Sequence, residues 1–222
     1  MHVPPSPTDP VPEPYREMIS TALERLEQDP RDDLSRTTFP FESQYAYDGI
    51  SKEQIDLYGN GTVAEERDME QFERICDFVV ENMPQDASAY DQYRYLAYFV
   101  SLCTDYDTRG TAGTLALTPY GAVMGGKSVC FGFSNCFLYL CEKADLWCRG
   151  VSGFAAYNGE PHSWNMVKLE DGTYYVDVTW CDGSGEIGTI NWNSNFMLTE
   201  SMLLETHNMS GDAVATGHII YE

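Results

Sequence analysis

Residues 125–140 read GGKSVCFGFSNCFLYL, a stretch in which a glycine-containing loop becomes an amphipathic helix. Phe133, Phe137 and Leu140 recur at intervals of three and four residues and predict one apolar helix face. The helix should begin near Cys130, which places this thiol at the positive end of the helix dipole, where the thiolate is favoured. Because the thiolate is the nucleophilic form, Cys130 is a candidate for covalent catalysis. The alternative is a small buried hydrophobe, the usual fate of a free cysteine.

A base for such a nucleophile is predicted in PHSWNMVKL, residues 161–169. His162 begins an alternation of side chains that is typical of a strand with one face in the core. The other three histidines lie in the proline-rich start or in the less regular tail: His2, His207 and His218. A lone strand histidine is usually a satisfied polar group. The presence of a cysteine nucleophile and of a third, orienting group favours His162 as a general base.

The candidate for that third group is Asp177, in the segment YYVDVTWCD. Aspartate is depleted in strands, and a buried carboxylate is costly unless it is paired, for which an imidazolium is a good partner. The dipeptide Asp171–Gly172 predicts a tight turn that makes the two strands antiparallel neighbours. In that register Asp177 faces Met166, four residues from His162, so the two side chains share a face at an offset of about 13 Å. A different turn, a bulge or strong twist must close this distance.

The segments GGKSVCFGFS, PHSWNMVKL and YYVDVTWCD resemble, in this order, the Cys, His and Asp motifs of the transglutaminase-like superfamily, especially its bacterial core domains. The preceding YDQYRYLAYFVSLCTDYD is similar to the helix and Tyr-Asp turn that lead into the family's catalytic region. The resemblance covers residues 87–182 and implies a papain-like α+β fold. It also implies Cys130 as nucleophile, His162 as base and Asp177 as the residue that orients the base. Cys181 departs from the family, which often has an acidic residue there.

The chemistry that the resemblance implies is acyl transfer on protein or peptide amides. The Cys130 thiolate attacks the carbonyl, and His162 protonates the departing amine and then activates a primary amine or water. The sequence leaves open whether the protein is a protein-glutamine acyltransferase or a cysteine protease or amidase. The Cys130 backbone N–H should bind the developing oxyanion. Further candidates for oxyanion or substrate binding are Tyr120, Gly126 and Trp164, with core packing as the alternative role of Tyr120.

Neither a cofactor nor a metal is expected. The chain has seven cysteines but no CxxC pair, and its four histidines are scattered, which argues against a structural zinc site. Arylamine N-acetyltransferase, a related acyl-transfer enzyme, binds a polyanionic coenzyme, and the formal net charge of −22 without a basic cluster argues against that activity. The same charge disfavours nucleic acid and anionic membranes as partners and leaves a protein or peptide substrate.

The order of the predicted elements indicates an α+β fold with a mostly antiparallel sheet, because helices precede strands without βαβ alternation. Helices are expected over residues 14–28, 63–82 and 87–102, and again from Cys130. Strands are expected over residues 148–157, 163–169, 173–180 and 193–198, with strand-like pieces at 38–41 and 44–47. We divide the chain into a proline-rich tether (1–14), an N-terminal helical extension (15–85) and a catalytic core (86–222).

The first fourteen residues, MHVPPSPTDPVPEP, contain six prolines and should be extended. Such a start often follows a removed export signal or lipid anchor, so we expect an extracellular or cell-surface protein, with a cytoplasmic location as the alternative. The sequence has no run of about 18 apolar residues, so no membrane span is expected. The alternative to an enzyme is a non-catalytic cell-surface binding module on a transglutaminase-like scaffold, since a fold does not imply an activity.

Overall fold

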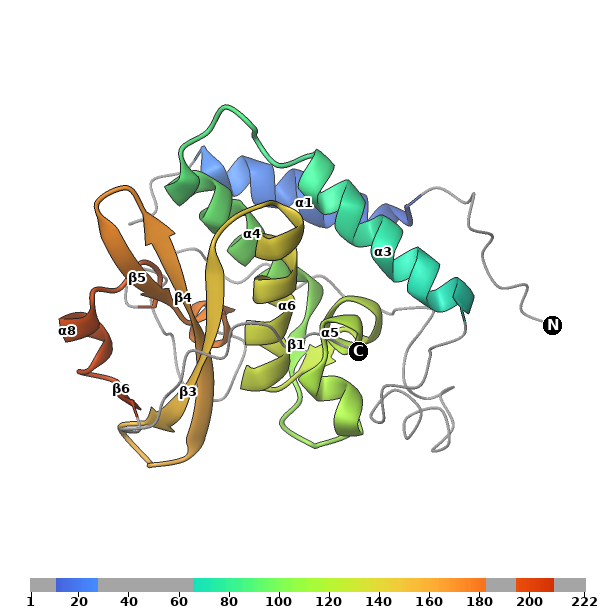
Figure 1. The fold of residues 1–222 in the computed structure, drawn as a ribbon. Helices are drawn as coiled ribbons and strands as arrows, with labels where there is room; N and C mark the ends of the chain where they lie inside the picture. The colour runs from blue at the N-terminus through green and yellow to red at the C-terminus, as the bar shows by residue number, and fades with distance from the viewer. Residues whose placement is uncertain (1–10, 28–65, 183–194, 210–222) are drawn as a thin grey trace.

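The computed structural model describes residues 11–27, 66–182 and 195–209 (Figure 1). The helices are α1 (Glu13–Leu26), α3 (Glu66–Glu81), α4 (Ala89–Cys103), the 3₁₀ helix η2 (Gly113–Leu117), α5 (Pro119–Gly125), α6 (Cys130–Lys143), α7 (Val178–Asp182) and α8 (Glu200–Leu203). The strands are β1 (Asp105–Tyr106), β2 (Lys127–Ser128), β3 (Cys148–Ala155), β4 (Pro161–Leu169), β5 (Gly172–Val176) and β6 (His207–Met209). The predicted strand-like pieces at 38–41 and 44–47 lie outside the described residues, as do His2 and His218.

The long helices bury one shared hydrophobic core. Met18 of α1, Ile75 of α3, Phe99 of α4 and Phe137 of α6 are fully buried in it. Figure 1 shows α6 in the middle of the molecule, between the strands on one side and α3 and α5 on the other. The described helices on both sides of residue 85 therefore pack into the same core, while the division of the chain at that residue stays a prediction.

Four strands form one antiparallel sheet in the order β5-β4-β3-β6, and α6 packs against β3 and β4. Helices packed on a mostly antiparallel sheet confirm the predicted α+β fold. Of the strand predicted at 193–198, the described part makes a single isolated bridge, between Leu198 and Tyr175. Within the described ranges, no helix has both the length and the apolar character needed to cross a membrane.

A second sheet, which the sequence did not predict, consists of the two short parallel strands β1 and β2. Tyr106 of β1 pairs with Ser128 of β2. Because β2 ends two residues before Cys130, this ladder holds the Tyr106–Asp107 segment beside the amino end of α6.

The hairpin between β4 and β5 corrects the predicted register. Its two turn residues are Glu170 and Asp171, one position earlier than the predicted Asp171–Gly172 pair, and Gly172 already belongs to β5. As a result Asn165 pairs with Val176, whereas the predicted register paired it with Val178. A shift by two residues keeps each side chain on its predicted face, because the side-chain period of a strand is two.

This shift brings Asp177 closer to its partner. Asp177 directly follows β5 and stands opposite Trp164, two residues from His162 instead of the predicted four, which halves the offset to about 7 Å.

The strand predicted over 173–180 also ends early. Asp177 Oδ1 accepts a hydrogen bond from the Trp180 backbone N–H at 3.2 Å. An aspartate in this place caps a helix, so the chain turns into α7 instead of continuing as a strand.

Candidate active site

Cys130 is the first residue of α6, where the sequence pattern placed it. It is partly exposed, whereas the other six cysteines are all buried. Burial raises the pKa of the Cys76, Cys103 and Cys141 thiols well above the ordinary value, so these three remain protonated at neutral pH. Cys130 is therefore the one cysteine that a substrate can reach.

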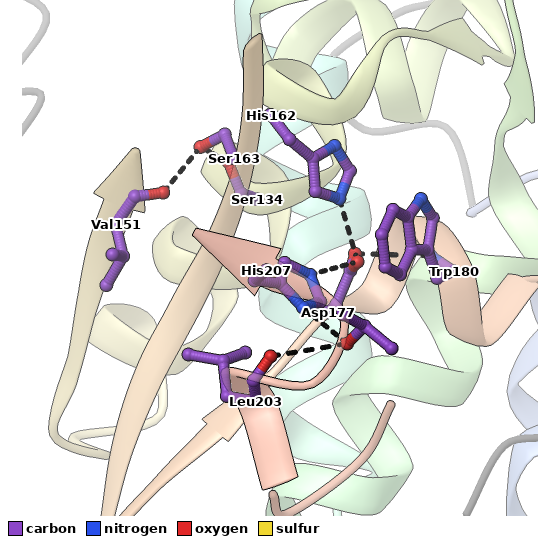
Figure 2. Close-up of polar contacts among 9 residues, drawn as sticks. Ser134, Val151, His162, Ser163, Asp177, Trp180, Leu203 and His207 are labelled. Carbon is purple, nitrogen blue, oxygen red and sulfur yellow. Dashed lines mark hydrogen bonds and ion pairs between the residues drawn. The ribbon is translucent and has the colours of Figure 1, made fainter. Parts of the chain in front are cut away.

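His162 lies near the start of β4 and points at Asp177, as Figure 2 shows. Its Nε2 atom is 2.8 Å from Asp177 Oδ2. Burial disfavours the charged imidazolium, but the Asp177 carboxylate outweighs this effect, and a hydrogen bond with the Cys130 side chain adds to it. Together they raise the pKa of His162 to about 10. Since Nε2 binds Asp177, Nδ1 is the nitrogen that serves Cys130.

Asp177 is fully buried at the junction of β5 and α7. Burial on its own would raise the pKa of this carboxyl group. The positive charge and hydrogen bond of His162, together with a hydrogen bond from His207, lower the pKa to about 2 instead. Asp177 is thus a carboxylate at neutral pH, and the structure brings the three residues predicted as nucleophile, base and orienting group into one cluster.

His207 belongs to this cluster, although the sequence placed it in the less regular tail. Its Nε2 atom lies 3.1 Å from Asp177 Oδ2, and its side chain is fully buried (Figure 2). The strand that carries it, β6, is three residues long and pairs with β3, where His207 stands opposite Ala155. No local pattern in so short a strand distinguishes His207, because only the long-range pairing with β3 brings it to Asp177.

Two tryptophan rings fix the planes of the imidazoles. The Trp180 ring stacks on His162 with a centroid distance of 4.6 Å and an interplanar angle of 19°. The Trp164 ring meets His207 edge-on at 4.6 Å and lies 5.9 Å from the His162 ring. Such contacts hold the two imidazoles in a single orientation toward Asp177.

The three other candidate binding residues lie at different depths. Trp164 is fully buried beside both imidazoles. Tyr120 is 8% exposed and packs against Phe72 in the core, with ring centroids 5.8 Å apart. Gly126 ends α5 with a φ of 67°, a left-handed conformation that favours glycine, so the backbone alone explains this residue. The binding roles of these three residues stay predictions.

Tyr106, which the sequence analysis did not single out, lies next to Cys130. The Cys130 backbone N–H forms a hydrogen bond with it. Burial raises the pKa of Tyr106 to about 12, and the negative charges of Cys130, Glu160 and Tyr157 add to this effect, so the hydroxyl keeps its proton. The sequence feature that could have identified Tyr106 is its place in the Tyr-Asp turn before η2.

The loop after Tyr106 is held by a buried carboxylate. Asp107 accepts hydrogen bonds from the backbone N–H groups of Thr111, at 3.1 Å, and Ala112, at 2.7 Å. Its own N–H donates to the Ser128 carbonyl at 2.7 Å. These bonds tie the loop to β2 and keep Tyr106 beside the amino end of α6.

The ligand atoms of His162, Asp177 and His207 lie within 4.8 Å of one another, a set that could hold a metal ion. In a tetrahedral zinc site, bonds of about 2.0–2.2 Å keep nitrogen and oxygen ligands roughly 3.3 Å or more apart. Asp177 Oδ2 instead lies 2.8 and 3.1 Å from the two imidazole nitrogens, which is hydrogen-bond spacing. As placed, the three side chains are hydrogen-bonded to one another and lie too close together to coordinate a zinc ion tetrahedrally.

Parts of the chain are similar to known proteins. Residues 76–180 match the family model of the transglutaminase-like superfamily. Among solved structures, a protein named as a TGase is 21% identical, with a TM-score of 0.48 over 60% of this chain and 37% of that one. A proposed cysteine protease from Cytophaga hutchinsonii is 13% identical, with a TM-score of 0.43 over 66% of this chain and 49% of that one.

The chain thus spans less than half the length of either solved structure. The search of curated proteins found no match. The family match contains Cys130, His162 and Asp177 and runs from the end of α3 to α7. Residues 76–180 of this chain are a core domain of the transglutaminase-like superfamily.

Proposed function

We propose that this protein catalyses cysteine-dependent acyl transfer or hydrolysis on protein or peptide amides. The observation that supports this most strongly is the chain of contacts from Cys130, at the amino end of α6, through His162 to the buried Asp177. A nucleophile, a base and a group that orients the base are the components that covalent acyl transfer needs.

In the first step the Cys130 thiolate attacks the amide carbonyl and forms a carbon–sulfur bond. The carbon–nitrogen bond then breaks, and the leaving amine or ammonia takes the proton of the His162 imidazolium. The thioester that results is attacked by water or by a primary amine, which gives its proton to His162. Collapse of that intermediate releases the acid or the new amide and returns Cys130 to the thiolate.

The oxyanion of each tetrahedral intermediate needs hydrogen-bond donors that are in place before it forms. The Cys130 backbone N–H is one donor, and the Tyr106 hydroxyl beside it is the second. In the free protein these two groups bond to each other, so a substrate oxygen that enters between them replaces one hydrogen bond with two. This assignment puts Tyr106 in the role that the sequence had offered to Tyr120.

Two surface features support a class of substrate. The formal charge of −22 favours cationic partners such as lysine-rich proteins. Tyr157 is 60% exposed and packs against Trp180, with ring centroids 6.0 Å apart, which gives a bound peptide an aromatic surface next to His162.

Selective alkylation tests the proposal without a known substrate. The protein is treated with iodoacetamide near neutral pH, and mass spectrometry follows the modification of each cysteine. We expect Cys130 to react fastest and to slow in His162→Ala, while the neighbouring surface variant Lys127→Ala reacts like the wild type. Equal rates for Cys130 and the six buried thiols would contradict the proposal and leave the non-catalytic binding module as the better description.

Transfer and hydrolysis are separated by the fate of the acyl group. A glutamine-containing protein is incubated with a labelled primary amine, and both label incorporation and peptide fragments are measured. Incorporation that disappears in Cys130→Ala identifies amine transfer, whereas cleavage or ammonia release with no incorporation identifies hydrolysis. If wild type and Cys130→Ala behave alike in both measurements, acyl transfer on these substrates is wrong.

A further inference from the structure

Two histidines bind the same oxygen atom of Asp177. His162 Nε2 lies 2.8 Å and His207 Nε2 lies 3.1 Å from Asp177 Oδ2, as Figure 2 shows. The acyl-transfer mechanism uses His162 and leaves His207 without a task. His207 is fully buried and approaches from β6, on the opposite edge of the sheet from β5. A buried imidazole that contacts a catalytic carboxylate requires an explanation of its own.

The proton on His207 can be located from its surroundings. Its Nδ1 atom lies 2.9 Å from Thr206 Oγ1. The Thr206 hydroxyl donates to the Leu203 carbonyl at 3.3 Å, and the Thr206 backbone N–H donates to the same carbonyl at 3.0 Å. The ionised Asp177 carboxylate can only accept hydrogen bonds. The His207 Nε2 atom that faces Asp177 Oδ2 therefore carries a proton and donates it to the carboxylate.

This donor makes the Asp177 site rigid. Asp177 Oδ1 accepts from the Trp180 N–H and Oδ2 accepts from His207, so neither oxygen can rotate away. Both donors reach Asp177 from outside the Cys130–His162 contact, so they stay in place whether or not His162 carries its proton. A carboxylate with two fixed donors remains ionised in a fully buried site, which is the state that a protonated His162 needs.

We propose that His207 is a positioning residue, a fixed donor that holds the Asp177 carboxylate so that His162 stays protonated beside Cys130. This inference rests on the proposed function, since it assigns His207 a role in activating the same cysteine. Thr206, which directly precedes β6, holds the other side of the His207 ring through the 2.9 Å contact between its Oγ1 atom and Nδ1.

The test measures the rate of Cys130 alkylation against pH in wild type, His207→Leu and His207→Gln. Leucine keeps the approximate volume of the side chain but removes the donor, whereas the glutamine amide can still donate to Asp177. We expect His207→Leu to slow alkylation at neutral pH roughly 10- to 100-fold, the effect of one lost hydrogen bond to a charged group. We also expect the acid limb of its profile, the pH range over which the Cys130 thiolate forms, to move to higher pH, and His207→Gln to stay within a few-fold of wild type.

Two further variants separate positioning from a structural role. Asp177→Asn combined with His207→Leu should react no more slowly than Asp177→Asn alone, because His207 acts through Asp177. Asn208→Ala, an exposed neighbour of His207 on β6, is the matched control and should leave the pH profile unchanged. If His207→Leu folds and keeps the wild-type profile while wild-type Cys130 is activated, the inference is wrong and the proposed function stands.

A failure to fold does not end the test. Thr206 is exposed, so Thr206→Val should fold even where His207→Leu does not. Without the hydroxyl, Nδ1 loses its 2.9 Å contact and the His207 ring is held less firmly against Asp177, so we expect alkylation to slow several-fold with the same shift of the acid limb. A wild-type profile in Thr206→Val would overturn the inference. If wild-type Cys130 reacts no faster than the buried thiols, it is the proposed function that fails.

Discussion

His162 Nε2 lies 2.8 Å from Asp177 Oδ2, and this ion pair joins two segments on either side of one hairpin. The two-residue turn at Glu170 and Asp171 sets the register that brings Asp177 near His162, and the helix cap at Trp180 fixes the carboxylate there. The positive charge of His162 at neutral pH depends on the nearby Asp177 carboxylate. It therefore depends on the turn and the helix cap that position this carboxylate.

The first prediction concerns Asp177→Asn. With the carboxylate removed, the pKa of His162 should fall from about 10 toward its ordinary value, because burial then opposes the imidazolium without compensation. The basic limb of activity, which needs the His162 imidazolium, should move to lower pH, and the turnover rate should fall by roughly 10³-fold or more. Asp171→Asn, on the exposed turn of the same hairpin, is the control and should leave the profile unchanged.

The second prediction concerns the stability of the fold. The pKa of His162 is raised to about 10 in the folded protein, so its stabilising effect is complete below about pH 6.5 and is lost as the pH rises toward 10. The pKa of Asp177 is lowered to about 2, so its effect is complete above about pH 4 and is lost as the pH falls through 2. Together they stabilise the fold most between about pH 4 and 6.5.

Urea unfolding of wild type and His162→Gln at several pH values measures this effect. The difference in the free energy of unfolding between the two proteins should be largest near pH 5 and should shrink by at most about 1.4 kcal/mol for each pH unit above 6.5. A difference that stays constant from pH 5 to pH 10 would show that the His162–Asp177 pair does not titrate as described.

The third prediction concerns Gly132, two residues after the nucleophile. A methyl group at this position would lie closer than 3 Å to the Ala116 carbonyl oxygen and the Ser128 hydroxyl. Gly132→Ala should therefore push α6 away from η2 and β2, cost about 1–3 kcal/mol of stability and displace Cys130 from His162. Gly172→Ala is the control, because the nearest atom to its new methyl group is 4.0 Å away.

Both glycine variants are compared by denaturant unfolding and by the alkylation rate of Cys130. The control should be as stable as wild type or slightly more so, since alanine restricts the unfolded chain more than glycine does. Equal losses in the two variants would mean that the close approach of Gly132 to η2 and β2 is not important.

The fourth prediction concerns the Tyr106 hydroxyl as an oxyanion donor. Tyr106→Phe keeps the ring, which stacks near Phe133 at a centroid distance of 6.4 Å, and removes only the hydroxyl. The turnover number should fall roughly 10²-fold with little change in KM, because the hydrogen bond to the oxyanion exists only in the transition state and the intermediates. Tyr174→Phe, whose hydroxyl lies on the exposed side of β5 and bonds Asp171, should have no effect.

Local sequence patterns were sufficient to predict the main elements and the position of Cys130 at the start of α6. The apolar spacing after Cys130 predicted α6 and its first residue, because helix periodicity depends on neighbours three and four residues apart. The position of His162 on a strand and the unusual Asp177 likewise depend on nearby residues. These motifs occur in the same order as in the transglutaminase-like superfamily, whose family model matches residues 76–180.

The tertiary structure decided how these residues meet and which others join them. The turn between β4 and β5 moved by one position, because hairpin register depends on pairing along both strands as well as on one dipeptide. His207 reaches Asp177 only through the pairing of a three-residue strand with β3, and Tyr106 reaches Cys130 only through the ladder with Ser128.

The sequence by itself thus determined that Cys130 begins a helix and which strands lead to His162 and Asp177. These features follow from local side-chain periodicity and the residue preferences of helices and strands. Only the tertiary structure decided that Asp177 is shared by two histidines and that a tyrosine lies beside Cys130. Contacts between residues distant in the chain depend on strand pairing and core packing, which no local pattern encodes.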